Sequence, residues 1–210
     1  MASMLYIESS PRKERSHSIE IAQTFIDEYQ QFHPVDVINI LDLWKIELPV
    51  FDGEVINAKY AILHGQEHTA KQKEAWSAVE KVIEDFTSAD KYLISLPMWN
   101  FGIPYKLKHY IDVLVQPGYT FSYSPTEGYK GLVTGKSAVL IYARGGAYGS
   151  GTGGEKLDMQ KSYMETVLGF IGFSNIQSIV IEPTLKSTPE ELEKIKDAAK
   201  EQAKTISRNF

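Results

Sequence analysis

The sequence predicts an α/β fold in which a doubly wound, five-stranded parallel sheet has helices on both faces. Three observations lead to this prediction. Short apolar runs alternate with longer stretches of helical period along the 210 residues. Strands that alternate with helices in this way favour a parallel sheet covered on both sides. No linker-like stretch interrupts the alternation, so we expect a single domain over residues 1–210.

Each strand is expected where a short apolar or β-branched run ends at a turn or helix signal. The five predicted strands are residues 4–7, 35–40, 91–96, 137–142 and 176–181. Apolar residues at three- and four-residue spacing predict helices at residues 19–29, 75–86, 104–114 and 156–170. A capping box at Thr188 opens one further helix. We expect residues 41–57 to be irregular and residues 118–131 to form a hairpin.

Composition argues against several classes of protein. The chain has no cysteine, which excludes disulfides and a thiol nucleophile and fits a reducing, cytoplasmic location. No run of about 18 apolar residues is present to span a membrane, and the N-terminal residues do not resemble a signal peptide. The net charge of -5 argues against a nucleic-acid partner, which would favour a basic surface.

The first predicted strand runs into the polar segment ESSPRKERSHS, residues 8–18, which has four serines and no glycine. Two interpretations remain open. Ser16 or Ser18 could simply cap the following helix. Alternatively, the hydroxyls, the basic side chains and the helix N-terminus form an anion site, because free first-turn amides and the helix dipole bind phosphate. In doubly wound sheets ligands bind at the carboxyl ends of strands, where this segment is expected.

Two further loops follow the third and fourth strands. PMWNFGIP, residues 97–104, has large apolar side chains that either cover the end of the core or line a pocket for a flat ligand. In the second case Asn100 and backbone amides would bind the polar edge of that ligand. YARGGAYGSGTGGEK, residues 142–156, is either a mobile glycine-rich loop or a close backbone approach to a ligand. Arg144, directly after the strand, favours binding.

Three short motifs are discounted because their context is wrong. GSGTGG, residues 149–154, matches G-x-G-x-x-G but begins about six residues past its strand. GLVTGKS, residues 131–137, leads into a strand rather than out of one. The H-x-x-E-H pattern at residues 64–68 has no third ligand, so we predict no metal site. No catalytic triad or nucleophile elbow is evident, which indicates that a cofactor performs any chemistry.

Ser9-Ser10, Ser16-His17-Ser18, PMWNFGIP and ARGG together resemble the FMN-dependent NADH-azoreductases, which belong with the quinone reductases in the flavodoxin-like fold. The resemblance covers nearly the whole chain. It implies a homodimer that binds FMN tightly and non-covalently and takes electrons from NADH or NADPH. The cofactor-binding residues it implies are Ser10, Ser16, His17, Ser18, Met98, Trp99, Asn100, Phe101, Ala143, Arg144, Gly145 and Gly146.

The resemblance also assigns a role to each segment. The serine segment would hold the phosphate and ribityl chain, residues 98–101 would line the isoalloxazine, and residues 143–146 would approach its pyrimidine side. Ala143 stands where relatives often have serine, and Tyr148 where relatives can have histidine.

The implied reaction is ping-pong. NADH delivers hydride to N5 of FMN and leaves, and a quinone or azo compound then accepts two electrons at the same face. No side chain is expected to be an essential acid or base. Two other readings remain open, namely a flavodoxin-like carrier of single electrons and a flavin-free binding domain of the same topology.

Overall fold

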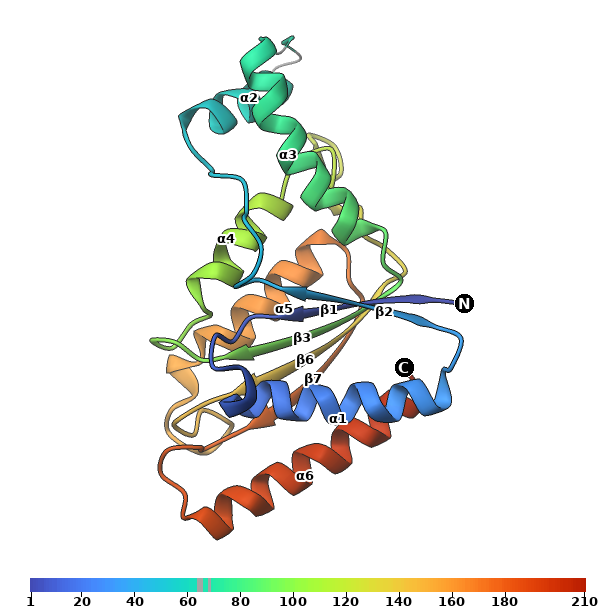
Figure 1. The fold of residues 1–210 in the computed structure, drawn as a ribbon. Helices are drawn as coiled ribbons and strands as arrows, with labels where there is room; N and C mark the ends of the chain where they lie inside the picture. Colours follow the sequence, from blue (N-terminus) through green and yellow to red (C-terminus); the bar gives the residue numbers. More distant parts are fainter. Residues whose placement is uncertain (64–65, 68) are drawn as a thin grey trace.

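Five parallel strands form the centre of the molecule in the order β2-β1-β3-β6-β7 (Figure 1). The computed structural model describes residues 1–63, 66–67 and 69–210. The strands are β1 Ser3–Glu8, β2 Val37–Asp42, β3 Lys91–Pro97, β6 Ser137–Ala143 and β7 Asn175–Ile181. The chain passes from β1 outward to β2 and then crosses back to β3, so the topological switch lies between β1 and β3. The predicted flavodoxin-like doubly wound sheet is confirmed.

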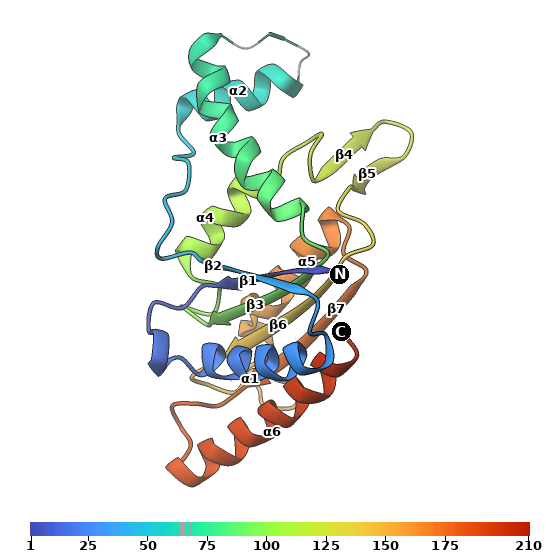
Figure 2. The same ribbon diagram turned by 45° about the vertical axis from the view of Figure 1, so that its right-hand side comes forward.

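Helices cover both faces of this sheet. In the described part of the chain they are α1 His17–Phe32, α2 Gly53–Leu63, α3 Ala70–Thr87, α4 Tyr105–Leu114, α5 Met159–Ile171 and α6 Pro189–Arg208. Helices α1 and α6 lie side by side on one face, and α3, α4 and α5 lie on the other (Figures 1 and 2). Helix α2 and the start of α3 project away from the sheet as an arm.

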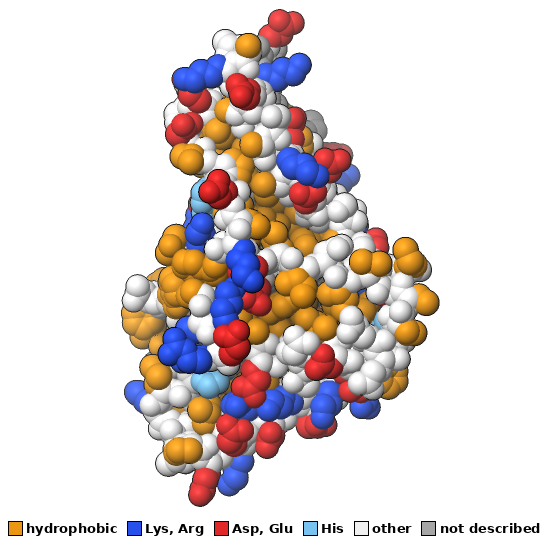
Figure 3. Space-filling view, viewed as in Figure 1, with side chains coloured by type: hydrophobic (Ala, Val, Ile, Leu, Met, Phe, Trp, Pro, Cys, Tyr) orange, Lys and Arg blue, Asp and Glu red, His pale blue; other side chains and the backbone are white. Residues whose placement is uncertain are grey.

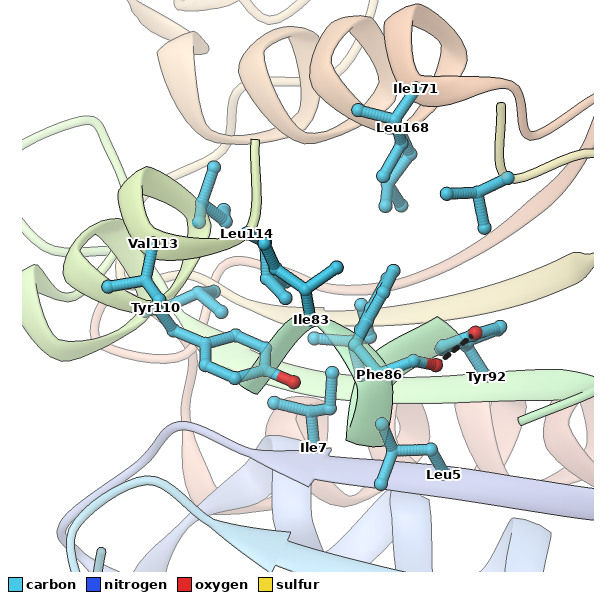
Figure 4. Packing of buried hydrophobic residues seen from close by; sticks show 14 of the residues in the cluster. Leu5, Ile7, Ile83, Phe86, Tyr92, Tyr110, Val113, Leu114, Leu168 and Ile171 are labelled. Atoms are coloured by element: carbon cyan, nitrogen blue, oxygen red, sulfur yellow. Dashed lines mark hydrogen bonds between the residues drawn. The ribbon is translucent and has the colours of Figure 1, made fainter. Parts of the chain in front are cut away.

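The central strands are buried on both faces because their alternate side chains enter two separate apolar clusters. Met4 and Tyr6 of β1 pack beneath α1 and α6. Leu5 and Ile7 of the same strand enter the opposite cluster, where Phe86 of α3 approaches them (Figure 4). Because both faces are buried, the sequences of these strands are continuous apolar runs and do not alternate between apolar and polar residues. Each buried side chain of this size contributes roughly 1.5–3 kcal/mol.

One helix was not expected from the sequence. Residues 41–57 were predicted to be irregular, but α2 begins at Gly53, so the prediction is wrong for residues 53–57. The carboxylate of Asp52 accepts hydrogen bonds from the amides of Glu54 and Val55 at 3.0 and 3.2 Å, and so caps the helix. The sequence signal was weak because, among the side chains of α2 that the structure describes, the buried ones are short: Val55, Ala58 and Ala61.

The other elements agree with the prediction apart from their ends. Helix α3 begins earlier than expected, at Ala70, because Thr69 and Gln72 form a capping box. The predicted hairpin is confirmed as antiparallel strands β4 Phe121–Ser124 and β5 Gly128–Gly131, which project beside α5 (Figure 2).

Two further observations concern membranes and metals. Among the described residues, no helix combines the length and apolar character needed to cross a membrane. Over the same residues, no group of three His, Cys, Asp or Glu side chains is arranged to hold a metal ion. The H-x-x-E-H motif includes residues 64, 65 and 68, which lie outside the described residues.

Candidate functional site

The loops that follow β1, β3 and β6 are tied together at the carboxyl edge of the sheet. Both the amide and the hydroxyl of Ser9 donate to the carbonyl of Ser95, at 3.1 and 2.7 Å, which fixes the first loop to β3. The amide of Met98 donates to the carbonyl of Ala143 at 2.8 Å, which fixes the second loop to β6. The candidate residues from three distant segments therefore lie at one place.

Helix α1 begins with amides that its own N-cap leaves unsatisfied. Ser16 occupies the N-cap position, yet its hydroxyl makes no capping bond and lies 3.2 Å from the hydroxyl of Ser18. Ser10, Ser16 and Ser18 are all buried. In the described structure no hydrogen bond uses the first-turn amides of His17, Ser18 and Ile19. Free amides and buried hydroxyls at the positive end of a helix favour the anion interpretation over a simple cap.

The charged residues of this segment differ in what they offer an anion. The ammonium of Lys13 pairs with Glu8 and lies 2.6 Å from the carboxylate of Asp42, so it is directed to the ends of β1 and β2. Burial lowers the pKa of His17, and nearby Lys196 lowers it further, so the imidazole is neutral at pH 7.

The other two cations of the segment are available. Arg12 and Arg15 are exposed, and no ion pair holds either of them within the described residues. Both can therefore supply positive charge to an anion at the start of α1.

The second loop contains a tight turn with unfavourable backbone angles. Asn100 and Phe101 have φ values of 47° and 68°, in the left-handed region. Paired hydrogen bonds between Trp99 and Gly102, at 3.0 and 2.9 Å, close the turn as in a type I′ hairpin. A left-handed residue other than glycine costs roughly 1–2 kcal/mol. A strained backbone of this kind is typically found at functional sites, where it holds a side chain in one orientation.

This turn presents Phe101 to the third loop. The side chain of Phe101 is 42% exposed although it is large and apolar. Its ring meets the ring of Tyr148 edge to face, with 6.3 Å between centroids. The two rings form a partly open apolar wall between the loops after β3 and β6.

An aromatic cluster that the sequence did not predict supports the first two loops. Trp44, just after β2, lies 6.0 Å from Trp99 and 5.5 Å from Tyr105 between ring centroids. Its indole nitrogen donates to the carbonyl of Ser9 at 2.9 Å. Trp44 thus links the serine segment to the PMWNFGIP loop. Trp44 lies within residues 41–57, which were predicted to be irregular, and no local pattern there indicated this role.

Arg144 is buried, with 2% of its surface exposed. Its guanidinium donates to Gln160 at 3.0 Å and pairs with Asp158 at 2.9 Å and with Glu182 at 3.2 Å. The charge and donors of Arg144 are therefore engaged within the protein. The donors that this loop leaves free are backbone amides, since no hydrogen bond of the described structure uses the amide of Gly145. The same holds for Gly146.

Comparison with known proteins gives consistent matches along the chain. The model of a family described as having a flavodoxin-like fold matches residues 2–206. A protein of Desulfotalea psychrophila named FMN-dependent NADH:quinone oxidoreductase is 50% identical, with all of this chain and 98% of the relative covered. A protein of the same name from Nitratidesulfovibrio vulgaris is 47% identical over the full length of both.

Solved structures agree with these sequence matches. An azoreductase from Bacillus anthracis has a TM-score of 0.91 at 33% identity, with both chains fully covered. An FMN-dependent NADH-azoreductase from the same species, in complex with FMN, has a TM-score of 0.86 at 27% identity, covering 99% of this chain and 100% of that one.

Proposed function

Because this chain belongs to the FMN-dependent NADH:quinone oxidoreductases of flavodoxin-like fold, we propose that it passes two electrons from NADH, through FMN, to quinones and azo compounds. The protein is an oxidoreductase. The observation that carries the proposal is the convergence of three loops, with free amides, buried hydroxyls and an apolar wall, at the carboxyl edge of the sheet.

The residues at the start of α1 fit the phosphate of FMN. A phosphate has several acceptor oxygens and accepts from amides and hydroxyls at once. The first-turn amides of α1 and the hydroxyls of Ser10, Ser16 and Ser18 offer such donors without a glycine cradle. We propose that these residues, together with His17, hold the phosphate and the ribityl chain.

The other two loops fit a flat ring with one apolar face and one polar edge. Residues 98–101 supply large apolar side chains in a turn whose backbone is fixed by its own hydrogen bonds. Gly145 and Gly146 supply backbone amides without partners in the described structure. We propose that the first group lines the isoalloxazine and that the second approaches its pyrimidine side. Amides aimed at that edge would stabilise negative charge there.

The protein's share of the reaction is binding and orientation. FMN, when bound, supplies the hydride chemistry that the side chains lack. Phe101 and Tyr148 offer a substrate an apolar wall, and the partly open site admits one flat molecule after another. We therefore propose ping-pong kinetics and no essential acid or base side chain.

Reconstitution and steady-state kinetics test this function. The purified chain is titrated with FMN, and the reduction of a benzoquinone and of an azo dye is then followed with NADH and separately with NADPH. We expect a yellow protein, turnover with NADH and parallel lines in double-reciprocal plots. A protein that stays colourless in excess FMN would overturn the proposal and favour a flavin-free binding domain.

A carrier of single electrons is the second candidate for the same fold. A carrier should stabilise the one-electron reduced flavin, whereas a two-electron reductase should not. The hairpin β4–β5 and the arm formed by α2 and α3 enlarge the molecule around the sheet and suit an enzyme better than a minimal carrier. Photoreduction followed by absorbance distinguishes the two, because only the carrier accumulates the intermediate spectrum.

We also propose a homodimer in the cytoplasm. Apolar side chains gather on the face formed by α3, α4 and α5 (Figure 3), and Tyr105 and Met159 at the starts of α4 and α5 are 61% and 58% exposed. A second copy would cover such a surface. Light scattering should give twice the mass of the chain. Met159→Glu should weaken the dimer, whereas Val35→Glu, at an exposed residue before β2, should not. The cytoplasmic location rests on the absence of cysteine.

A further inference from the structure

The carboxylate that follows β7 holds the glycine-rich loop by its backbone. One oxygen of Glu182 accepts from the amide of Tyr148 at 3.0 Å, and the other accepts from the amide of Gly149 at 2.8 Å. Hydrogen bonds to a charged acceptor are roughly twice as strong as those between neutral groups. A loop rich in glycine has a large conformational entropy to lose, so two such bonds decide which conformation it adopts.

Glu182 is itself held in place by a buried counter-ion. The guanidinium of Arg144 lies 3.2 Å from the carboxylate of Glu182, and the side chains of both are mostly removed from solvent, with 1% and 15% exposed. Arg144 also binds Asp158, which caps α5 through the amide of Lys161 at 2.9 Å. The carboxylate is thereby fixed relative to β6 and to the start of α5.

The loop that Glu182 holds includes one wall of the site. The ring of Tyr148 packs over Gly146, where an added Cβ would lie 3.1 Å from the phenol oxygen. The same ring meets Phe101 across the opening. The free amides of Gly145 and Gly146 lie three and two residues before Tyr148 in the chain. Their direction therefore depends on where the backbone of Tyr148 is fixed.

We propose that Glu182 is a positioning residue of the flavin site, which, with Arg144 as its counter-ion, fixes the glycine loop on which ring binding and the Tyr148 wall depend. This inference rests on the proposed function, because it concerns the FMN site. It assigns Arg144 a place behind the loop rather than against the ligand.

Substitution of the carboxylate by its amide tests the inference. Glu182→Gln loses the charge that binds Arg144, and its NH2 group faces two backbone donors, so at least one amide loses its acceptor. We expect the dissociation constants of FMN and of riboflavin to rise together, by about tenfold. Riboflavin has the ribityl chain but lacks the phosphate, so a double variant of Ser16 and Ser18 should weaken FMN much more than riboflavin. With FMN saturating, the KM for a quinone should rise while kcat stays within about twofold.

A matched control separates positioning from general stability. Glu28 is 14% exposed and pairs with Arg208 at 2.7 Å, away from the three loops, so Glu28→Gln loses an ion pair of a carboxylate as little exposed as Glu182. That variant should bind both flavins like the parent. If Glu182→Gln binds both flavins as tightly as Glu28→Gln does, the inference is wrong. If the parent itself binds no FMN, the proposed function fails instead.

Amide hydrogen exchange in the parent protein tests the same inference without a substitution. It therefore still applies if Glu182→Gln does not fold. In the parent the amides of Tyr148 and Gly149 should exchange more slowly than that of Ser150, which has no hydrogen-bond partner in the described structure. Equal exchange at all three would show that the carboxylate does not hold the loop.

Discussion

The ring of Phe101 stands edge-on to the ring of Tyr148, at 6.3 Å, although the backbone of Phe101 has a φ of 68° that an aromatic residue rarely adopts. The contact joins the loops after β3 and β6. Glycine would adopt this φ without strain. The side chain at this position is therefore retained at a cost in stability, as expected where a site requires it.

Replacing Phe101 by glycine should relieve the strain of the turn and reduce activity at the same time. Phe101→Gly and Phe101→Ala both remove the ring, but only glycine relieves the backbone strain. We expect the glycine variant to unfold at higher urea, with a free energy of unfolding about 1 kcal/mol above that of the alanine variant. Both should have a higher KM for a quinone than the parent. Equal stability of the two variants would show that the turn is not strained.

Removing the hydroxyls at the start of α1 should weaken the binding of FMN. In Ser16→Ala/Ser18→Ala two buried donors are lost, and we expect the dissociation constant of FMN to rise about tenfold or more. Flavin fluorescence measures it directly. A double variant of Ser77 and Ser88, in and just after α3, removes two exposed hydroxyls as a control. Unchanged FMN affinity in the first variant would remove the phosphate role.

Lys13 should matter for stability rather than for the cofactor. Lys13→Met leaves the carboxylates of Glu8 and Asp42, 14% and 13% exposed, without their shared cation. We expect a loss of about 2 kcal/mol at pH 7, because Glu8 becomes an unpaired, partly buried charge and Asp42 keeps only Lys45, at 3.6 Å. FMN affinity should change little. A large drop in affinity at unchanged stability would place the ammonium at the ligand instead.

The effect of Lys13 should depend on pH in a defined direction. Burial raises the pKa of Asp42, but its bonds to Lys13 and to the amide of Trp44 outweigh burial and hold the pKa below its usual value. A lowered carboxylate pKa stabilises the fold above the unfolded value and loses that contribution as pH falls through the folded value. The difference between parent and Lys13→Met should therefore shrink below about pH 3.9. Urea titrations at several pH values check this.

Trp44 should support the serine segment through its indole nitrogen. Trp44→Phe keeps a ring against Trp99 but leaves the buried carbonyl of Ser9 without this donor. We expect a loss of about 1–2 kcal/mol of stability and weaker FMN binding. Trp76→Phe, which removes a bond of 3.1 Å to Tyr119, should lower stability without affecting FMN. If Trp44→Phe and Trp76→Phe weaken FMN binding equally, Trp44 acts on the cofactor only through the stability of the fold.

The sheet and most helices could be predicted because their signals are local. A strand such as β6 is a continuous apolar run, and α1 buries Ile21, Phe25 and Tyr29 at helical spacing. The placement of three loops at one edge followed from topology alone. Helix α2 could not be predicted in this way, because Asp52 was its main signal.

The partners of the charged residues could not be predicted, because they are distant in the chain. Arg144 is conspicuous after its strand, but the sequence does not show that Glu182, just after β7, would face it. Lys13 lies in a basic segment, yet its partner Asp42 comes from β2. Such pairs depend on the register of neighbouring strands and on side-chain direction, neither of which a local pattern determines.

Strand β2 lies at the edge of the sheet and pairs with β1 alone among the described strands. Val37 and Ile40 of this strand are 44% and 64% exposed, so its outer edge combines free backbone groups with β-branched side chains. An edge of this kind can recruit another strand and start aggregation. Asp36 before the strand and Asp42 at its end are 9% and 13% exposed and are paired with Lys91 and Lys13, so their charge does little to oppose such pairing. The outer edge of β2 is therefore a place in the described sheet at which association between molecules can begin.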